Sequence, residues 1–163
     1  MRPIEPLPLH HSWPLYDLRA HLAPVLLDSS IARNDAALAE RGLGLWHCDL
    51  NDNSLRWTAG VYDIFGLERD SSVSRPLSAS LYAPDSREAM ERLRAYAIRH
   101  KRGFTLDVDI HQADGMGQCA MRLIAAPVLN EADDVIGLHG VKQLLPRGAV
   151  ASQRLDPTIF VML

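Results

Sequence analysis

The sequence predicts an α+β fold in which a five-stranded antiparallel sheet carries helices on one face. Three observations lead to this fold class. Two strand patterns occupy residues 42–57, helical patterns occupy residues 59–101, and three consecutive strand patterns occupy residues 104–145. Because a three-stranded meander with one apolar face must cover that face, we expect the remaining chain to form its cover. Further helices are expected before residue 42.

Composition narrows the function classes. The 163 residues suffice for one domain with a real core, and 47% apolar with 23% charged residues is ordinary for a soluble globular protein. The formal net charge of -3 gives no attraction to nucleic acid or to an anionic membrane. No apolar run approaches the roughly 20 residues of a membrane span. Four prolines interrupt Met1–Leu15, which therefore does not resemble a signal peptide, and we expect a cytoplasmic protein.

The N-terminal segment predicts irregular chain followed by two helices. Met1–Pro14 is rich in proline, and leucines then recur at helical spacing over residues 15–27, where Pro24 kinks or ends the helix. Asp28 and the two serines after it offer an N-cap for a second helix that ends near Glu40. Exposed leucines on one helix are normally buried against another surface, which predicts a homodimer. The dimer-interface candidates are Leu15, Leu18, Leu22 and Leu26.

A hairpin and a short helix are expected next. The strands are Gly42–Leu50 and Ser54–Trp57, joined by a tight turn of asparagine and aspartate. Thr58 can cap a short helix over Ala59–Phe65, and Gly66 can end it. The apolar residues of this helix are expected to face inward.

The strongest helical pattern lies in the middle of the chain. Residues 68–80 are expected to form a polar loop, and a helix is expected over Pro84–Lys101, with Gly103 as its terminator. The basic cluster at residues 99–102 is explained by the negative end of the helix dipole, although a phosphate-binding patch is the alternative. The buried stripe is expected to comprise Ala89, Met90, Leu93, Tyr96 and Ala97.

The C-terminal third predicts a meander of three strands. Phe104–His111 alternates apolar and polar residues without a break, which is typical of a half-buried strand. A turn at Asp114 and Gly115 leads into a second strand over Gln118–Val128. A polar turn then leads into a third strand over Val135–Leu145.

Four stretches resemble motifs of one known family. Residues 44–50 read Gly-Leu-Trp-His-Cys-Asp-Leu, similar to a first-strand motif G-x-W-x-x-D-L. Residues 61–67 end in Phe-Gly-Leu, and residues 81–87 are similar to a V-H-P-D-D-R helix start, with alanine in place of the histidine. Together with the meander after residue 104, these stretches resemble a PAS domain of the kind found in bacterial sensor kinases and diguanylate cyclases.

The resemblance implies a domain division and a role. It predicts an N-terminal extension over residues 1–41, a PAS-like domain over 42–145 and a tail over 146–163. PAS domains sense ligands, associate with proteins, or do both. The closing Asp-Ile-Thr motif of the family is replaced at residues 143–146, and the tail is too short for an output domain. We therefore expect a stand-alone sensory or regulatory module of bacterial signal transduction, acting through an unidentified signalling partner and a homodimer.

Members of the family that bind flavin or haem carry sequence features that this chain lacks. Flavin-binding members carry a reactive cysteine in a helix, whereas Cys48 and Cys119 lie in strand patterns and are expected to be buried, reduced thiols. Haem-binding members use a histidine of the long helix, but His100 lies at the C-terminal end of that helix, where it favours the dipole. Flavin and haem are therefore both disfavoured, and the cofactor is unknown.

The strands offer only weak candidates for catalytic or metal-binding residues. Asp107, Asp109 and His111 share one strand face and could suggest acid–base work or a metal site. This is the polar face of an alternating strand, however, and we expect it to be either a solvated outer face or a surface against the N-terminal helix. The sequence contains neither a nucleophile elbow nor a phosphate loop. We therefore expect no metal site, no catalytic residue and no enzyme activity.

The hollow between sheet and helices is the best candidate site. Its lining residues either fill the core, which makes the chain a ligand-free structural adaptor or dimerisation module, or surround a small apolar ligand. The ligand-pocket candidates are Trp46, Cys48, Trp57, Phe65, Phe104, Leu106, Val108, Met121, Leu123 and Leu138.

Overall fold

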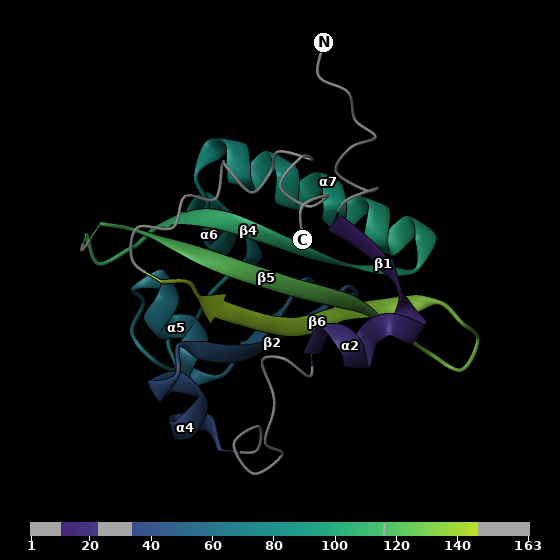
Figure 1. Ribbon diagram of the computed structural model, residues 1–163, viewed down its shortest axis with the longest axis horizontal. Helices are drawn as coiled ribbons and strands as arrows, with labels where there is room; N and C mark the ends of the chain where they lie inside the picture. Colours follow the sequence, from purple (N-terminus) through teal and green to yellow (C-terminus); the bar gives the residue numbers. More distant parts are fainter. Residues whose placement is uncertain (1–10, 23–33, 116, 147–163) are drawn as a thin grey trace.

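The computed structural model describes residues 11–22, 34–115 and 117–146. Its centre is one six-stranded sheet in which every neighbouring pair is antiparallel, in the order β1-β4-β5-β6-β2-β3 (Figure 1). The α+β class predicted from the sequence is confirmed. The strands are β1 (Ser12–Pro14), β2 (Leu43–Asp49), β3 (Leu55–Trp57), β4 (Arg102–His111), β5 (Gln118–Leu129) and β6 (Val135–Leu144).

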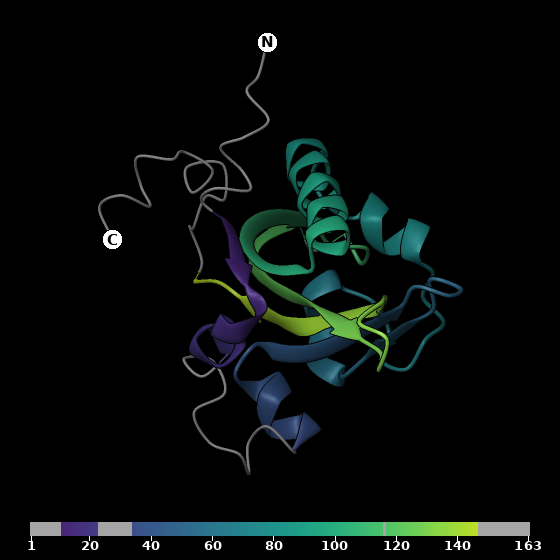
Figure 2. The same cartoon turned by 90° about the vertical axis from the view of Figure 1, so that its right-hand side faces the viewer.

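Helical segments lie on both faces of this sheet (Figure 2). The inner face packs against α5, α6 and α7, whereas the outer face packs against the N-terminal segment and α4. The expectation of helices on one face is therefore correct for the helices after residue 58. The helical segments are η1 (Leu15–Asp17), α2 (Leu18–Leu22), α4 (Asp35–Glu40), α5 (Ala59–Phe65), α6 (Arg75–Ser80) and α7 (Pro84–His100).

The sixth strand was not predicted, because irregular chain was expected up to Pro14. Strand β1 pairs with β4 in the register Ser12 to Phe104 and Pro14 to Arg102. Trp13 Nε1 donates a hydrogen bond to the Thr105 hydroxyl at 3.0 Å. Without β1, strand β4 would be an open edge, and covering an edge satisfies its backbone groups and prevents pairing with other chains.

The close fit of β1 depends on a glycine. A Cβ atom at Gly103 would lie 2.3 Å from the ring of Trp13, so the absence of a side chain there lets the indole lie flat on β4. Gly103 was expected to end the long helix. That expectation is wrong, because α7 ends two residues earlier at Lys101, which adopts a left-handed conformation with φ 55°.

The polar loop expected over residues 68–80 is partly wrong. A short helix, α6, forms at its end, where the Ser74 side chain accepts a hydrogen bond from Leu77 N at 3.2 Å. Pro76 lies in the first turn of α6, where a missing N–H costs no helical hydrogen bond.

The N-terminal helices overlap their predicted ranges within the described residues. The helix predicted from Leu15 begins as a 3-10 turn and continues as α2 to Leu22. The second helix, α4, starts after Asn34, whose Oδ1 accepts from Ala37 N at 3.2 Å. Pro24, Leu26 and the cap proposed at residues 28–30 lie outside the described residues.

Helix α5 matches its predicted bounds, and Gly66 ends it with φ 70°. The cap differs from the expectation, because the Thr58 side chain makes no cap hydrogen bond and instead accepts from Leu45 N at 2.9 Å. Asp35 Oδ1 accepts from Ala59 N at 2.8 Å in its place. These two bonds attach the start of α5 to strand β2 and to α4.

The inner core follows the predicted alternation. Phe104, Leu106, Val108 and Ile110 of β4 are all buried in one cluster with residues of β5, α5 and α7. A separate outer cluster forms around Trp13, Leu38 and Ile124 on the opposite face. No helix of the described segments is long and apolar enough to cross a membrane.

Candidate ligand-binding cavity

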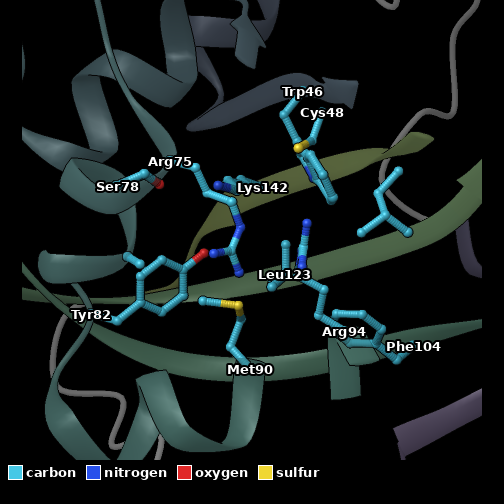
Figure 3. Close-up of a pocket in the computed structure, with 12 residues that line it drawn as sticks. Trp46, Cys48, Arg75, Ser78, Tyr82, Met90, Arg94, Phe104, Leu123 and Lys142 are labelled. Carbon is cyan, nitrogen blue, oxygen red and sulfur yellow. The ribbon is translucent and has the colours of Figure 1, made fainter. Parts of the chain in front are cut away.

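A small, partly open cavity lies between the inner face of the sheet and helices α6 and α7 (Figure 3). Its volume is about 60 Å³. The sheet contributes Trp46, Cys48, Phe104, Leu123, Leu138 and Lys142 to its walls. The helical side contributes Arg75, Ser78, Ala79, Tyr82, Met90 and Arg94.

The most unusual side chain at this cavity is Lys142, which is 5% exposed. Strand β6 places Lys142 beside Leu123 of β5 and Gly44 of β2, and Leu123 belongs to the inner core. The glycine has a packing role here, because a Cβ at Gly44 would lie 2.4 Å from the Val61 side chain of α5. Lysine is almost never fully buried unless it is paired, so its position needs an explanation.

Aromatic rings surround the Lys142 ammonium. Its Nζ lies 4.7 Å from the ring centre of Phe65, 5.2 Å from Trp57, 5.3 Å from Trp46 and 5.9 Å from Tyr82. Each distance is within the range where the negative face of a ring attracts a cation. No hydrogen bond or ion pair joins Lys142 to another residue of the described segments.

Burial controls the charge state of this lysine. Removal from water disfavours the ammonium and lowers the pKa of Lys142 from 10.5 to about 7. Near neutral pH the site therefore holds a mixture of amine and ammonium. Any anion placed beside Nζ would shift that mixture toward the charged form.

The helical wall carries one ion pair. Arg75 Nη2 donates to Glu91 Oε1, which ties α6 to α7 above the cavity. Tyr82 is 3% exposed, and burial raises the pKa of its hydroxyl well above the usual range, so the hydroxyl stays neutral. Arg94 Nη2 lies 3.4 Å from Asn53 Oδ1, a neutral acceptor.

Two buried indole donors have no acceptor among the described residues. They are Trp46 Nε1 and Trp57 Nε1, and Trp46 also lines the cavity. An unsatisfied buried donor costs about 1–3 kcal/mol, and native proteins contain few of them. The cavity therefore presents cations and donors, and the lining contains few groups that could accept.

Half of the ligand-pocket candidates predicted from the sequence line the cavity. Trp46, Cys48, Phe104, Leu123 and Leu138 line it. The other five candidates pack into the inner core without lining the cavity: Trp57, Phe65, Leu106, Val108 and Met121.

The polar residues of the cavity lining were not predicted, although the sequence contains signals for them. Arg75 was placed in a loop because α6 was not predicted. Lys142 follows Leu138 by four positions in one strand, and the period of two puts both on the same face. Residue type argues against that face, because lysine is normally exposed to solvent.

The dimer-interface candidates have contacts within their own chain. Leu15, Leu18 and Leu22 are partly buried against the outer cluster. Their spacing is thus accounted for by the sheet that they cover, and the homodimer stays a prediction. Leu26 lies outside the described residues.

A wider groove, open to solvent, lies on the other side of β2. Its volume is about 400 Å³, and its lining includes Leu22, Trp57 and the cross-strand pair His47 and His139. Burial, with a smaller effect of the nearby His47, lowers the pKa of His139. Two imidazoles are too few for a metal site, and the described residues contain no cluster of three or more histidine, cysteine or acidic side chains suited to a metal ion.

The polar strand face has a structural role. Asp107 was expected either on a solvated face or against the N-terminal helix. It is 6% exposed, which excludes the solvated face, and it accepts two hydrogen bonds from Arg122 at 2.8 and 3.1 Å. Cys48 and Cys119 are both free, as expected. Burial raises the pKa of the Cys119 thiol to about 11, which makes it a poor nucleophile.

Large cofactors do not fit the cavity as it stands. Sites for drug-sized ligands span roughly 300–1,000 Å³, several times the 60 Å³ found here. His100, the candidate haem ligand, lies at the end of α7, where its ring packs 4.3 Å from that of Tyr96. It does not belong to the cavity lining.

Comparison with known proteins supports the fold. No protein-family model matches the sequence, and no curated protein matches it. Three solved structures of PAS-type domains superpose well. The N-terminal domain of a diguanylate cyclase with a PAS/PAC sensor from Marinobacter aquaeolei has a TM-score of 0.56 and 15% identity, over 61% of this chain and 92% of that one.

The other two structures extend the comparison. The PAS domain of a protein from Colwellia psychrerythraea has a TM-score of 0.56 and 17% identity, over 72% of this chain and 98% of that one. The PAS domain of the fruit-fly ELK potassium channel has a TM-score of 0.53 and 20% identity, over 73% and 96%. The family resemblance in the sequence is thus confirmed at the level of the fold.

Proposed function

We propose that this chain, a PAS-like domain by its fold, is a sensory or regulatory module of signal transduction that responds to a small ligand held between its sheet and its helices. One observation carries the proposal: Lys142 is a buried cation at an internal cavity, without an ion pair to any described residue. Burying such a group in a filled core is costly. A ligand that contacts the ammonium offsets that cost and explains why a lysine occupies this position.

The proposed response passes through strand β6. Lys142 faces the cavity, whereas its neighbour Val141 belongs to the outer cluster on the opposite face. The same cluster contains Trp13, and the leucines of η1 and α2 pack against it. A ligand that displaces β6 at Lys142 therefore acts on the segment that covers the outer face, and the proposed output is a change in how that segment associates with a second copy or a partner.

Native mass spectrometry of the purified protein, together with its absorption spectrum, tests this proposal. We expect a bound mass beyond that of the chain, which is lost in Lys142→Met and kept in Lys101→Met. A bare chain in both variants and in the wild type, with no small molecule raising the melting temperature in a screen, would contradict it.

The same mass spectra report the oligomeric state. A substitution at Tyr16 tests the predicted dimer interface better than one at Leu22, because Leu22 also packs within its own chain. The Tyr16 side chain is 87% exposed, so Tyr16→Asp removes little packing within the described part of the chain. If the N-terminal segment forms the dimer interface, this variant is monomeric. A dimeric Tyr16→Asp places the interface elsewhere.

A ligand-free adaptor is the second candidate. The small cavity favours it, as does the dense core formed by Leu106, Val108 and Met121, each at most 1% exposed. A colourless, ligand-free dimer that no small molecule stabilises would support this function. Neither candidate involves a catalytic step.

A further inference from the structure

Positive charge accumulates at the cavity. Three cationic side chains line it, Lys142, Arg75 and Arg94. Glu91 neutralises one of them through its ion pair with Arg75. Arg94 reaches the neutral amide oxygen of Asn53, and Lys142 has no ion pair within the described segments. The described groups at the cavity therefore carry an excess of positive charge.

The hydrogen-bonding groups show the same imbalance. Trp46 Nε1 is buried without an acceptor, and its ring lines the cavity. Indole, ammonium and guanidinium groups donate hydrogen bonds and cannot accept them. A molecule that complements these groups needs oxygen acceptors, and an anion would also neutralise the excess charge.

We propose that the cavity binds a small carboxylate anion, with its oxygens beside the Lys142 ammonium and its hydrocarbon part against Met90, Leu123 and Leu138. This inference rests on the proposed function, because it names the class of ligand that the sensory site takes. The three apolar side chains line the same cavity as the cations. A fully oxygenated anion such as phosphate would leave its remaining oxygens against this apolar wall without donors.

The volume limits the size of the carboxylate. A water molecule needs about 10–15 Å³ of such space, so the 60 Å³ of the cavity corresponds to about four to six water-sized positions. Acetate, propionate and pyruvate have four to six non-hydrogen atoms by their chemical formulae. Monocarboxylates of this size match the cavity, and long-chain acids do not.

Binding of an anion is coupled to protonation. In the free protein, burial keeps the pKa of Lys142 at about 7, and a carboxylate beside Nζ raises it. At alkaline pH the complex therefore takes up a proton from the buffer onto Nζ as the anion binds. The other titratable or charged groups around the cavity are Cys48 of β2, Arg75 of α6, Tyr82 before α7, and Glu91 and Arg94 of α7.

Isothermal titration calorimetry of the full chain with sodium propionate tests the inference. If the free lysine titrates near pH 7, the affinity falls about tenfold between pH 6 and pH 8 once binding requires the ammonium. Titrations at pH 8 in two buffers of different ionisation enthalpy should show uptake of close to one proton. Propionamide, a neutral molecule of the same shape, should bind at least tenfold more weakly than propionate.

Single-residue variants distinguish a loss of propionate binding at Lys142 from a general effect on the protein. The sequence contains only two lysines, so Lys101→Met makes the same chemical change at an exposed position. We expect Lys142→Met to weaken propionate binding at least tenfold and Lys101→Met to leave it unchanged. Trp46→Phe replaces the indole by a smaller aromatic ring and removes the unpartnered donor. It should weaken binding several-fold in a protein with an unchanged circular dichroism spectrum.

The outcomes distinguish this inference from the function on which it rests. Equal binding of propionamide and propionate, or equal affinity at the two pH values, would overturn the carboxylate assignment and leave a ligand-binding module. Phosphate binding tighter than propionate would likewise overturn it in favour of an inorganic anion. Failure of every small molecule to bind would contradict the proposed function itself.

Discussion

Replacing Lys142 by methionine should stabilise the ligand-free protein, and the gain should depend on pH. Methionine has a similar length and no charge, so it can occupy the same aromatic surroundings of Trp46, Trp57, Phe65 and Tyr82. Replacing buried ionic groups by apolar ones of similar volume is often stabilising by roughly 1–4 kcal/mol. A purely packing role for the lysine predicts the opposite sign.

The magnitude follows from the difference in proton binding between the two states. Burial lowers the pKa of Lys142 from 10.5 to about 7 in the folded protein. Between these values the unfolded chain binds more protons than the folded chain, so wild-type stability rises with pH across this window. Below about pH 7 the cost of burial is present in full, and the gain in Lys142→Met is largest there.

The difference between a pKa of 10.5 and one of about 7 corresponds to about 5 kcal/mol near pH 6, at roughly 1.4 kcal/mol for each unit. Attraction to the four rings offsets part of this cost, so we expect a gain of about 2–5 kcal/mol. Above pH 7 it should shrink by at most about 1.4 kcal/mol for each pH unit and approach zero near pH 10. This slope is the distinctive part of the prediction, because a change in packing alone does not vary with pH.

Urea unfolding at intervals between pH 6 and pH 10, in buffers without small carboxylates, measures this gain. Lys101→Met is the matched control and should follow the wild type at every pH. The reasoning is refuted if Lys142→Met is less stable than the wild type throughout, or if its gain is the same at the two ends of the range.

Two further substitutions test the outer face of the sheet. Arg122→Met removes both hydrogen bonds to the buried Asp107, and because the Arg122 side chain is 39% exposed we expect a loss of about 1–2 kcal/mol in urea unfolding. Arg69→Met, at an exposed ion pair, should leave stability unchanged, and an equal loss in both variants would contradict the assignment. Gly103→Ala places a Cβ 2.3 Å from the Trp13 ring, so we expect a loss of about 1–3 kcal/mol and a red shift of tryptophan fluorescence, whereas an unchanged spectrum would show that β1 does not lie there.

The elements with long, regular patterns could be predicted from the sequence. Strand β4 alternates apolar and polar residues over Phe104–His111, and helix α7 carries a proline at its start and an apolar stripe along its length. In both, side-chain periodicity and the end signals agree, which is the condition under which local sequence fixes an element.

Short elements held by distant contacts could not be predicted in the same way. Strand β1 has three residues, one of them proline, and it exists because β4 offers an open edge and Gly103 makes room for Trp13. Helix α6 is six residues long, and its signals, Ser74 as the cap and Pro76 in the first turn, were present but lay in a polar stretch without periodicity.

The candidate site shows a conflict between two rules. The alternation that places Leu138 on the inner face also places Lys142 there, whereas the usual location of lysine is the surface. The structure resolves the conflict in favour of the period. Positions where such rules disagree are often functional, and the buried lysine is the feature on which the proposed ligand depends.

The most direct test of the central claim is the titration of Lys142 itself. Only two lysines occur in the chain, so lysine-selective ¹³C labelling gives two Cε resonances in NMR spectra, and Lys142→Met assigns them. Lys142 should titrate near pH 7 in the free protein and well above that when propionate is added. A Lys142 that titrates near 10.5 and does not respond to propionate would contradict the account of this residue as a buried cation that binds an anionic ligand.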